Sequence, residues 1–278
     1  MKIIALAAGA AAALVALPAA AQEDAGFNGL YVGAAGGYDV QSNDRNSRIL
    51  FDRNLDGRYG DVVRTGSGAD AFGPGFCNGA ARNQLSPANG GSCANDRDDW
   101  AYYGRVGLDT QRGRLVVGVV GEFGTTNITD SVTAFSGTPA SYVFSRGIDW
   151  EAGIRARAGF TPNDTTLFYG TFGPGYARID RAFGSTNLTN TFTGSGKRNQ
   201  FGIQGGGGVE QRIGRFSIGL EYLYHQYRDD DYVVRAGGPA GTPFTNAANG
   251  GTTAGTDFRR SDEQFRWHSM RATVGFRF

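Results

Sequence analysis

The stretch Trp-Glu-Ala-Gly-Ile-Arg-Ala-Arg-Ala-Gly-Phe, residues 150–160, alternates between two kinds of side chain. One set is apolar: Trp150, Ala152, Ile154, Ala156, Ala158 and Phe160. The other set is charged or small: Glu151, Gly153, Arg155, Arg157 and Gly159. A period of two separates the sets onto the two faces of a β-strand, whereas a helical period would mix them. The stretch therefore predicts a strand with one apolar and one polar face.

Outward from this stretch, the same alternation recurs along the chain, and together the segments predict eight strands. They span 29–40, 100–109, 115–125, 147–160, 166–178, 199–211, 216–227 and 264–278. Each is long enough for a tilted strand to cross a bilayer, which takes about 9–11 residues.

The connections between these segments alternate in length. Three are short (110–114, 161–165 and 212–215) and four are long (41–99, 126–146, 179–198 and 228–263). An even number of strands, with short turns at one end and long loops at the other, is typical of outer-membrane barrels. We therefore predict an all-β fold, an eight-stranded antiparallel up-and-down transmembrane β-barrel with long extracellular loops and both termini on the periplasmic side.

The first residues have the pattern of a secretory leader. Lys2 precedes an apolar run over 3–17, which Pro18 ends before the small residues Ala19-Ala20-Ala21. This pattern predicts a signal peptide over 1–21, an outer-membrane barrel domain over 22–278, and a long first extracellular loop over 41–99. The later sequence has no apolar run long enough for a helical span, which argues against a helical membrane protein.

Which face meets lipid depends on the charges of the polar face. Its acids and arginines are balanced: Asp39, Asp109, Glu122, Asp149, Glu151, Glu210 and Glu221 against Arg105, Arg155, Arg157, Arg178, Arg271 and Arg277. Paired charges and glycines suit the narrow lumen of a membrane barrel, where a buried charge needs a partner. We predict a lumen charge network of Glu122, Asp149, Glu151, Arg155, Arg157, Glu210, Glu221, Arg271 and Arg277. The apolar face would then meet lipid, with interfacial aromatics at Tyr102, Phe123, Trp150, Tyr224 and Phe276; the alternative is a secreted lipocalin-like barrel or sandwich.

Several short motifs resemble those of a known group. They are Gly29-Leu30-Tyr31-Val32-Gly33, Val119-Val120-Gly121-Glu122-Phe123, Gly206-Gly207-Gly208-Val209-Glu210, Leu220-Glu221-Tyr222-Leu223-Tyr224 and the final Val274-Gly275-Phe276-Arg277-Phe278. In this order they resemble the small outer-membrane β-barrels of the opacity-protein and OmpA/OmpX-like "porin family". The resemblance implies that Phe276 and Phe278 form a terminal signal for the outer-membrane insertion machinery. The first loop departs from the group because it is much longer.

The first loop holds two further candidate features. Cys77 and Cys93, the only cysteines, predict a disulfide in an exported protein, worth about 3 kcal/mol for a loop of about 15 residues. Asp52, Asn54, Asp56 and Asp61 resemble the first half of a calcium loop. Position twelve is Val63 instead of glutamate, so the alternative is a solvated turn. Calcium is the only cofactor that the sequence suggests.

Three classes of function remain. The first is a structural surface protein that contacts lipopolysaccharide, partners or surfaces through its loops. The second is a small passive pore, although eight strands leave an interior that side chains fill. The third, a lipid-modifying enzyme, would need His225 or His268 in an accessible cleft beside a serine or aspartate. The formal net charge of +1 gives no basis for a nucleic-acid partner, and we expect a monomer without enzymatic activity.

Overall fold

The computed structural model describes residues 26–41, 47–73, 75–78, 96–138, 140–196 and 198–278. The leader predicted over 1–21 lies outside these ranges. Within them, no helix is long and apolar enough to span a membrane, and one short 3₁₀ turn, η2 (Ala247–Asn249), is present.

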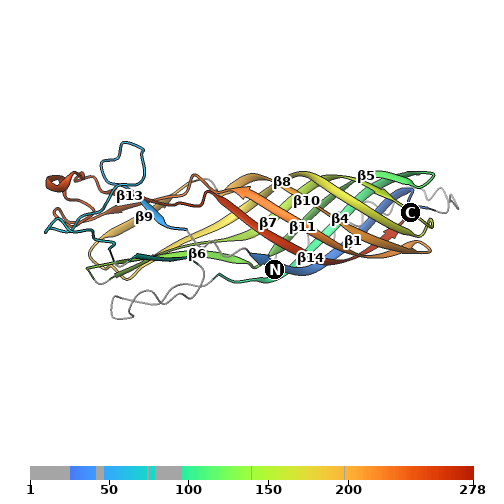
Figure 1. The fold of residues 1–278 in the computed structure, drawn as a ribbon, viewed down its shortest axis with the longest axis horizontal. Helices are drawn as coiled ribbons and strands as arrows, with labels where there is room; N and C mark the ends of the chain where they lie inside the picture. The colour runs from blue at the N-terminus through green and yellow to red at the C-terminus, as the bar shows by residue number, and fades with distance from the viewer. Residues whose placement is uncertain (1–25, 42–46, 74, 79–95, 139, 197) are drawn as a thin grey trace.

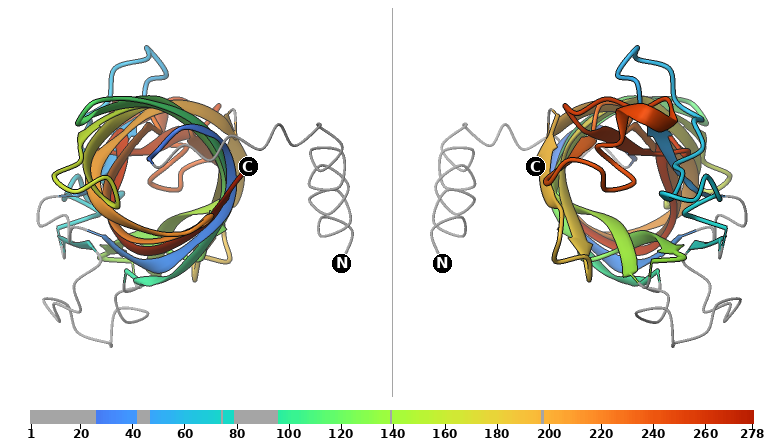
Figure 2. Two further views of the ribbon diagram at one scale, coloured as in Figure 1. Left: turned by 90° about the vertical axis from the view of Figure 1, so that its right-hand side faces the viewer. Right: turned by 90° about the vertical axis from the view of Figure 1, so that its left-hand side faces the viewer.

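The barrel is a closed antiparallel sheet. Its strands, in chain order, are β1 (Gly29–Gln41), β4 (Asp99–Arg112), β5 (Leu115–Thr126), β7 (Ala140–Phe160), β8 (Thr166–Ser185), β10 (Asn199–Ile213), β11 (Phe216–Arg228) and β14 (Gln264–Arg277). They pair around the ring in the order β7-β5-β4-β1-β14-β11-β10-β8, and β8 pairs with β7 to close it. Figure 2 shows the ring end-on. The predicted eight-stranded up-and-down barrel is confirmed.

Tight turns join the strands at one end of the barrel, as predicted. Gly113 and Gly214 adopt positive φ values of 57° and 63° there, a conformation that glycine enters without strain. The turns are linked to one another: the Thr161 amide donates to the Arg114 carbonyl at 2.8 Å, and the Arg212 amide to the Thr165 carbonyl at 2.7 Å. The chain ends at this rim, while the long connections all extend from the other end (Figure 1).

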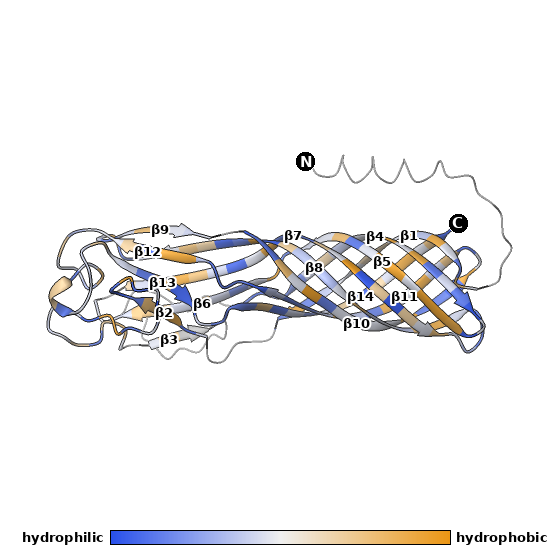
Figure 3. Ribbon diagram, turned by 90° about the horizontal axis from the view of Figure 1, so that it is seen from above, coloured by the Kyte–Doolittle hydropathy of each residue, from blue (hydrophilic) through white to orange (hydrophobic). Residues whose placement is uncertain are grey.

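The outer wall of the barrel is apolar. Exposed side chains on it include Val106, Leu108, Val117, Val119, Ile154, Phe172, Ile218, Leu220, Met270 and Val274, and Figure 3 shows these apolar stripes along the barrel. Aromatic rings border them towards the long-connection end: Tyr38, Trp100, Tyr102, Phe123, Trp150, Tyr176, Phe201 and Tyr224. A second belt lies at the tight turns: Phe160, Phe168, Phe216, Phe276 and Phe278. An apolar band between two aromatic girdles is the lipid-facing surface of a membrane barrel.

A β-bulge corrects one of the predicted lumen residues. The pairing of β7 with β8 shifts register between Ile148 and Trp150. The extra residue, Asp149, is exposed on the outer wall, where it forms an ion pair of 3.3 Å with Arg178. Strict alternation had placed both side chains in the lumen, but a bulge reverses the parity of the strand on one side of it. Asp149 is therefore not part of the lumen network.

Above the barrel, the long connections form an ordered β-sandwich. β2 (Ile49–Asp52), β13 (Thr256–Arg260), β12 (Val233–Gly237) and β9 (Thr191–Ser195) make one sheet. β3 (Gly75–Asn78) and β6 (Thr129–Ser136) pair beside the upper part of β7, which with upper β8 completes the facing sheet. We call this sandwich the extension; in Figure 1 it is the part to the left of the barrel.

An aromatic core holds the two sheets of the extension together. Its buried residues include Phe51, Phe72, Tyr142, Phe144, Phe244 and Phe258, with Phe183 and Phe192 packed against them. The ring of Phe258 contacts those of Phe51 and Phe244, with centroids 4.9 and 5.0 Å apart. The extension is thus a packed unit with a core separate from the lumen.

Candidate functional site

The middle of the lumen is a cluster of two glutamates and three arginines. Glu122 accepts from Arg155 at 2.8 Å and Arg271 at 3.2 Å, and lies 3.1 Å from the Arg105 guanidinium. Glu221 lies 3.1 Å from Arg105 and 3.5 Å from Arg155. All five side chains are almost completely buried. Such a cluster is stable only because each charge faces opposite charges.

The layer below closes the lumen towards the tight turns. Arg277 donates to Asp109 at 2.9 Å, and Arg157 pairs with Glu210 and lies 3.4 Å from Asp109. The ring of Tyr31 packs in the same layer, beneath Arg157 and against Gly107. A Cβ at Gly107 would lie 2.3 Å from this ring, so the close approach requires glycine.

The layer above surrounds Glu151. It accepts from Tyr227 at 2.9 Å and Gln204 at 3.1 Å, and lies 3.2 Å from His225 Nδ1. His225 Nε2 lies 3.0 Å from an Arg271 nitrogen, which can only donate, so Nε2 accepts and Nδ1–H donates to Glu151. His225 thus links Glu151 to Arg271.

Apart from Asp149, the residues predicted for the lumen network lie in these three layers: Glu122, Glu151, Arg155, Arg157, Glu210, Glu221, Arg271 and Arg277. The described lumen holds six acids (Asp39, Asp109, Glu122, Glu151, Glu210, Glu221) and five arginines (Arg105, Arg155, Arg157, Arg271, Arg277). The side chain of Asp39 bonds to Ser269, and its Oδ2 has no hydrogen-bond partner. Among these six acids, Asp39 is the one that forms no direct ion pair in the described lumen.

Neither histidine forms a catalytic constellation within the described part of the chain. His225 is fully buried, with its ring stacked on Trp267 at 4.7 Å. His268 lies on the outer wall, where Nδ1 is 2.6 Å from the Tyr222 hydroxyl. A nucleophile and its base need mutual contact and access to substrate, which neither arrangement offers.

An aromatic layer and a second charge cluster, both missed in the sequence, cover the lumen where it meets the extension. Trp267, Tyr227 and Phe265 pack with Ile128, Ile148, Ala177 and Ile179. Above them Arg146 donates to Asp130 at 2.6 Å, Asp229 at 3.0 Å and Asp262 at 3.1 Å. Strict alternation from Glu151 would place Arg146 and Ile148 on the outer face, and only the bulge at Asp149 turns both of them inward.

Asp96, just before β4, docks on this cluster and gives the extension a pH-dependent anchor. Its carboxylate accepts from the Ser131 amide at 2.7 Å. Burial, together with the neighbouring Asp130 carboxylate, raises the pKa of Asp96 to about 6.

We expect the extension to be more stable at pH 5 than at pH 7.5. The folded-state pKa of Asp96 lies above its unfolded value, so its stabilising contribution is complete below about pH 4 and is lost as the pH rises through about 6. Asp96→Asn should raise the thermal midpoint of the extension at pH 7.5 and flatten its dependence between these pH values. Melting curves at both pH values test this; an unchanged dependence in the variant would assign it to another group.

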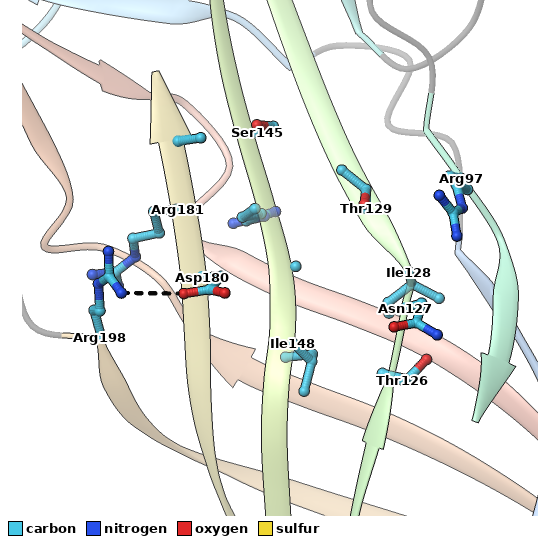
Figure 4. Close-up of a pocket in the computed structure, with 13 residues that line it drawn as sticks. Arg97, Thr126, Asn127, Ile128, Thr129, Ser145, Ile148, Asp180, Arg181 and Arg198 are labelled. Atoms are coloured by element: carbon cyan, nitrogen blue, oxygen red, sulfur yellow. Dashed lines mark hydrogen bonds and ion pairs between the residues drawn. The ribbon is translucent and has the colours of Figure 1, made fainter. Parts of the chain in front are cut away.

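A shallow groove of about 660 Å³ lies on the outside of the molecule, where the barrel meets the extension. Polar residues that are exposed or half-buried line it: Arg97, Asn127, Thr129, Ser145, Asp180 and Arg198. In Figure 4, Arg97 and Arg198 lie at opposite ends, and Arg198 donates to Asp180 at 3.2 Å. Arg97 pairs with Asp99. Trp150 and Tyr176 of the upper aromatic girdle lie a few residues below the groove on β7 and β8.

The two features predicted for the first loop have different outcomes. Asp52 ends β2, and Asn54, Asp56 and Asp61 lie in the segment that follows it. Asp52 accepts from the Gly57 amide at 2.8 Å and Asp61 from the Arg53 amide at 2.9 Å. No group of three or more His, Cys, Asp or Glu side chains in the described residues is arranged to hold a metal. Cys77 lies in β3, but Cys93 is outside the described residues. Calcium and the disulfide both stay predictions.

Comparisons with known proteins give only distant likenesses. No protein-family model matches the sequence, and no curated protein matches it. Among solved structures, Ail, the attachment invasion locus protein of Yersinia pestis, crystallised with the heparin analogue sucrose octasulfate, is 12% identical. That match covers 90% of this chain and 99% of that one, with a TM-score of 0.34. The outer membrane protease OmpT from Escherichia coli is 8% identical over 91% of this chain and 97% of that one, with a TM-score of 0.39.

These likenesses are too distant to carry a function, and the assignment rests on the geometry of the chain itself. An apolar wall between two aromatic girdles requires lipid around it, and closure of the sheet leaves no unpaired strand edge in that layer. Short turns at one rim and long connections at the other are typical of β-barrels of the bacterial outer membrane. The chain is an integral outer-membrane β-barrel of eight strands with a charge-filled lumen.

Proposed function

We propose that this protein is a non-enzymatic surface protein whose barrel anchors an extracellular β-sandwich for contact with lipopolysaccharide, partners or surfaces. The observation that carries the proposal is the division of the molecule: three buried charge layers fill the lumen, while the long connections pack around their own aromatic core. A filled lumen suits an anchor. An ordered extension offers a fixed surface, which loses less conformational entropy on binding than flexible loops would.

The alternative function, a small passive pore, would need a continuous gap through these layers. The middle of the lumen holds Glu122, Glu221 and their three arginine partners. The ion pairs between these carboxylates and guanidinium groups have N–O distances of 3.5 Å or less. Desolvated charges in such contact resist separation, which supports a closed lumen.

We expect the protein to be silent in a planar bilayer. The mature chain would be reconstituted, its insertion verified by heat-modifiable migration on a gel, and its single-channel conductance recorded beside a general porin in the same lipid. Absence of openings with verified insertion supports the anchor. Stable, reproducible openings would reject it in favour of the pore.

The remaining partners follow from the same placement. Outer-membrane lipid contacts the wall, and the insertion machinery would read Phe276 and Phe278 during biogenesis. These rings lie at the tight-turn rim, with centroids 5.3 Å apart. Calcium bound by Asp52, Asn54, Asp56 and Asp61 would stabilise the extension. We also propose that the protein acts as a monomer and has no nucleic-acid partner.

A further inference from the structure

The groove between barrel and extension lies at the depth of lipid headgroups. Gly147 and Asp180 pair across β7 and β8 at the groove, and Trp150 and Tyr176 follow on the same strands. A strand rises about 3.3 Å per residue, so the groove begins within roughly 10 Å of rings that occupy the membrane interface. A molecule bound here would come from the outer leaflet.

The lining suits a ligand that combines hydroxyl groups with anionic groups. Asn127, Thr129 and Ser145 supply amide and hydroxyl groups between the two ends of the groove. The side chains of Arg97 and Arg198 are more than half exposed, at 65% and 53%. Each is held by one aspartate, which leaves further N–H donors of its five free for an anion.

The spacing of the arginines points to two anionic groups on one ligand. Arg97 pairs with Thr129 of β6, β6 pairs with β7, β7 with β8, and the Arg198 carbonyl accepts from Ile179 of β8. Four steps of about 4.8 Å separate their backbones by roughly 19 Å. Both side chains can reach inward from there, so the anions they contact would be closer together than this, as at the two ends of a disaccharide.

We propose that this groove binds the phosphorylated disaccharide headgroup of an outer-leaflet glycolipid, with Arg97 and Arg198 each contacting one phosphate. Asn127, Thr129 and Ser145 hydrogen-bond the sugar hydroxyls, and the acyl chains follow the apolar wall below Trp150 and Tyr176. The inference rests on the proposed function, because it requires the barrel to be in the outer membrane. It adds to that function a specific lipid, its site and the residues that select it.

The test measures which lipid the inserted protein retains. Wild-type protein is inserted into phosphatidylcholine vesicles that contain equal amounts of bisphosphoryl lipid A and phosphatidylglycerol, extracted in mild detergent, and examined by native mass spectrometry. We expect one lipid A per barrel. Arg97→Gln/Arg198→Gln should lower its apparent affinity on the order of tenfold or more, since each arginine near a membrane surface contributes about fivefold.

The matched control is Arg228→Gln/Arg266→Gln. Both arginines lie at the same end of the barrel, at the tops of β11 and β14, and Arg228 also pairs with an aspartate, Asp230, at 2.6 Å. Neither lines the groove, so this variant should retain lipid A like the wild type. The wild type should bind monophosphoryl lipid A more weakly than bisphosphoryl lipid A. Replacing one of the two groove arginines should then no longer change the affinity for monophosphoryl lipid A.

Three results would overturn the proposal. Equal retention by the groove variant and the wild type would show that the arginines bind no phosphate. Equal retention of phosphatidylglycerol would show a phosphate site without selection for a saccharide. An equal loss in the control variant would show a general effect of rim charge. A protein that fails to insert, judged by heat-modifiable migration, would instead contradict the proposed function itself.

Discussion

Glu122→Gln should lower the free energy of unfolding of the barrel by about 3–5 kcal/mol. Glu122 is the one carboxylate that contacts three lumen arginines, Arg105, Arg155 and Arg271, at 2.8 to 3.2 Å. The amide keeps the shape but removes the charge, so the three buried guanidinium groups keep only their contacts with Glu151 and Glu221. Breaking a buried ion pair by changing one partner costs this much because the other charge stays buried. Urea titration in micelles, followed by heat-modifiable migration, measures the loss.

Asp39→Asn is the matched control, since it makes the same chemical change in the same lumen. Asp39 bonds to Ser269 through one oxygen, and its other oxygen has no described partner. The asparagine keeps an acceptor for Ser269 and removes a carboxylate that forms no direct ion pair in the described lumen. We expect the free energy of unfolding to change by less than about 1 kcal/mol. Equal losses in both variants would contradict the charge pairing described for the lumen.

The barrel could be predicted from the sequence because its rule is local. Each wall residue faces lipid or lumen according to its parity, so Trp150–Phe160 alone reveals both faces. Turn lengths then gave the order of the strands. The lumen residues were predictable for the same reason, since every polar residue of correct parity meets others in a narrow interior that side chains fill.

The exceptions to parity could not be predicted this way. The bulge at Asp149 adds one residue to β7, and nothing in Ile148-Asp149-Trp150 marks it. In the structure, Asp149 pairs with Arg178 on the outer wall. Strict alternation therefore placed one acid and one arginine in the lumen wrongly. Because the two have opposite charges, the predicted balance of lumen charges did not reveal the error.

The extension was missed because its contacts are distant in sequence. Phe51, Phe72, Tyr142 and Phe258 come from three different connections, and each connection alone reads as a polar, glycine-rich loop. Only after the barrel brings the connections to one rim can their aromatic rings meet. The groove has the same origin, because Arg97 and Arg198 are about a hundred residues apart and are brought to one face by strand pairing.

Phe258→Ala should unfold the extension and leave the barrel intact. The Phe258 ring is fully buried and lies within 6.4 Å of the rings of Phe51, Phe72, Tyr142, Phe183, Phe192 and Phe244. Replacing a buried phenylalanine by alanine costs about 3–5 kcal/mol through lost burial and the cavity left behind. Limited proteolysis should cleave the variant within the extension, whereas the barrel fragment should still migrate as a folded, heat-modifiable band.

Leu188→Ala is the control for this variant, because Leu188 lies in the extension with its side chain 96% exposed. It should resist protease like the wild type. If Phe258→Ala also destroyed heat-modifiable migration, the barrel and the extension would be one cooperative unit. If only the extension unfolded, the barrel would be stable without it, through its own lumen charges. The sequence of the extension could then change without loss of membrane insertion.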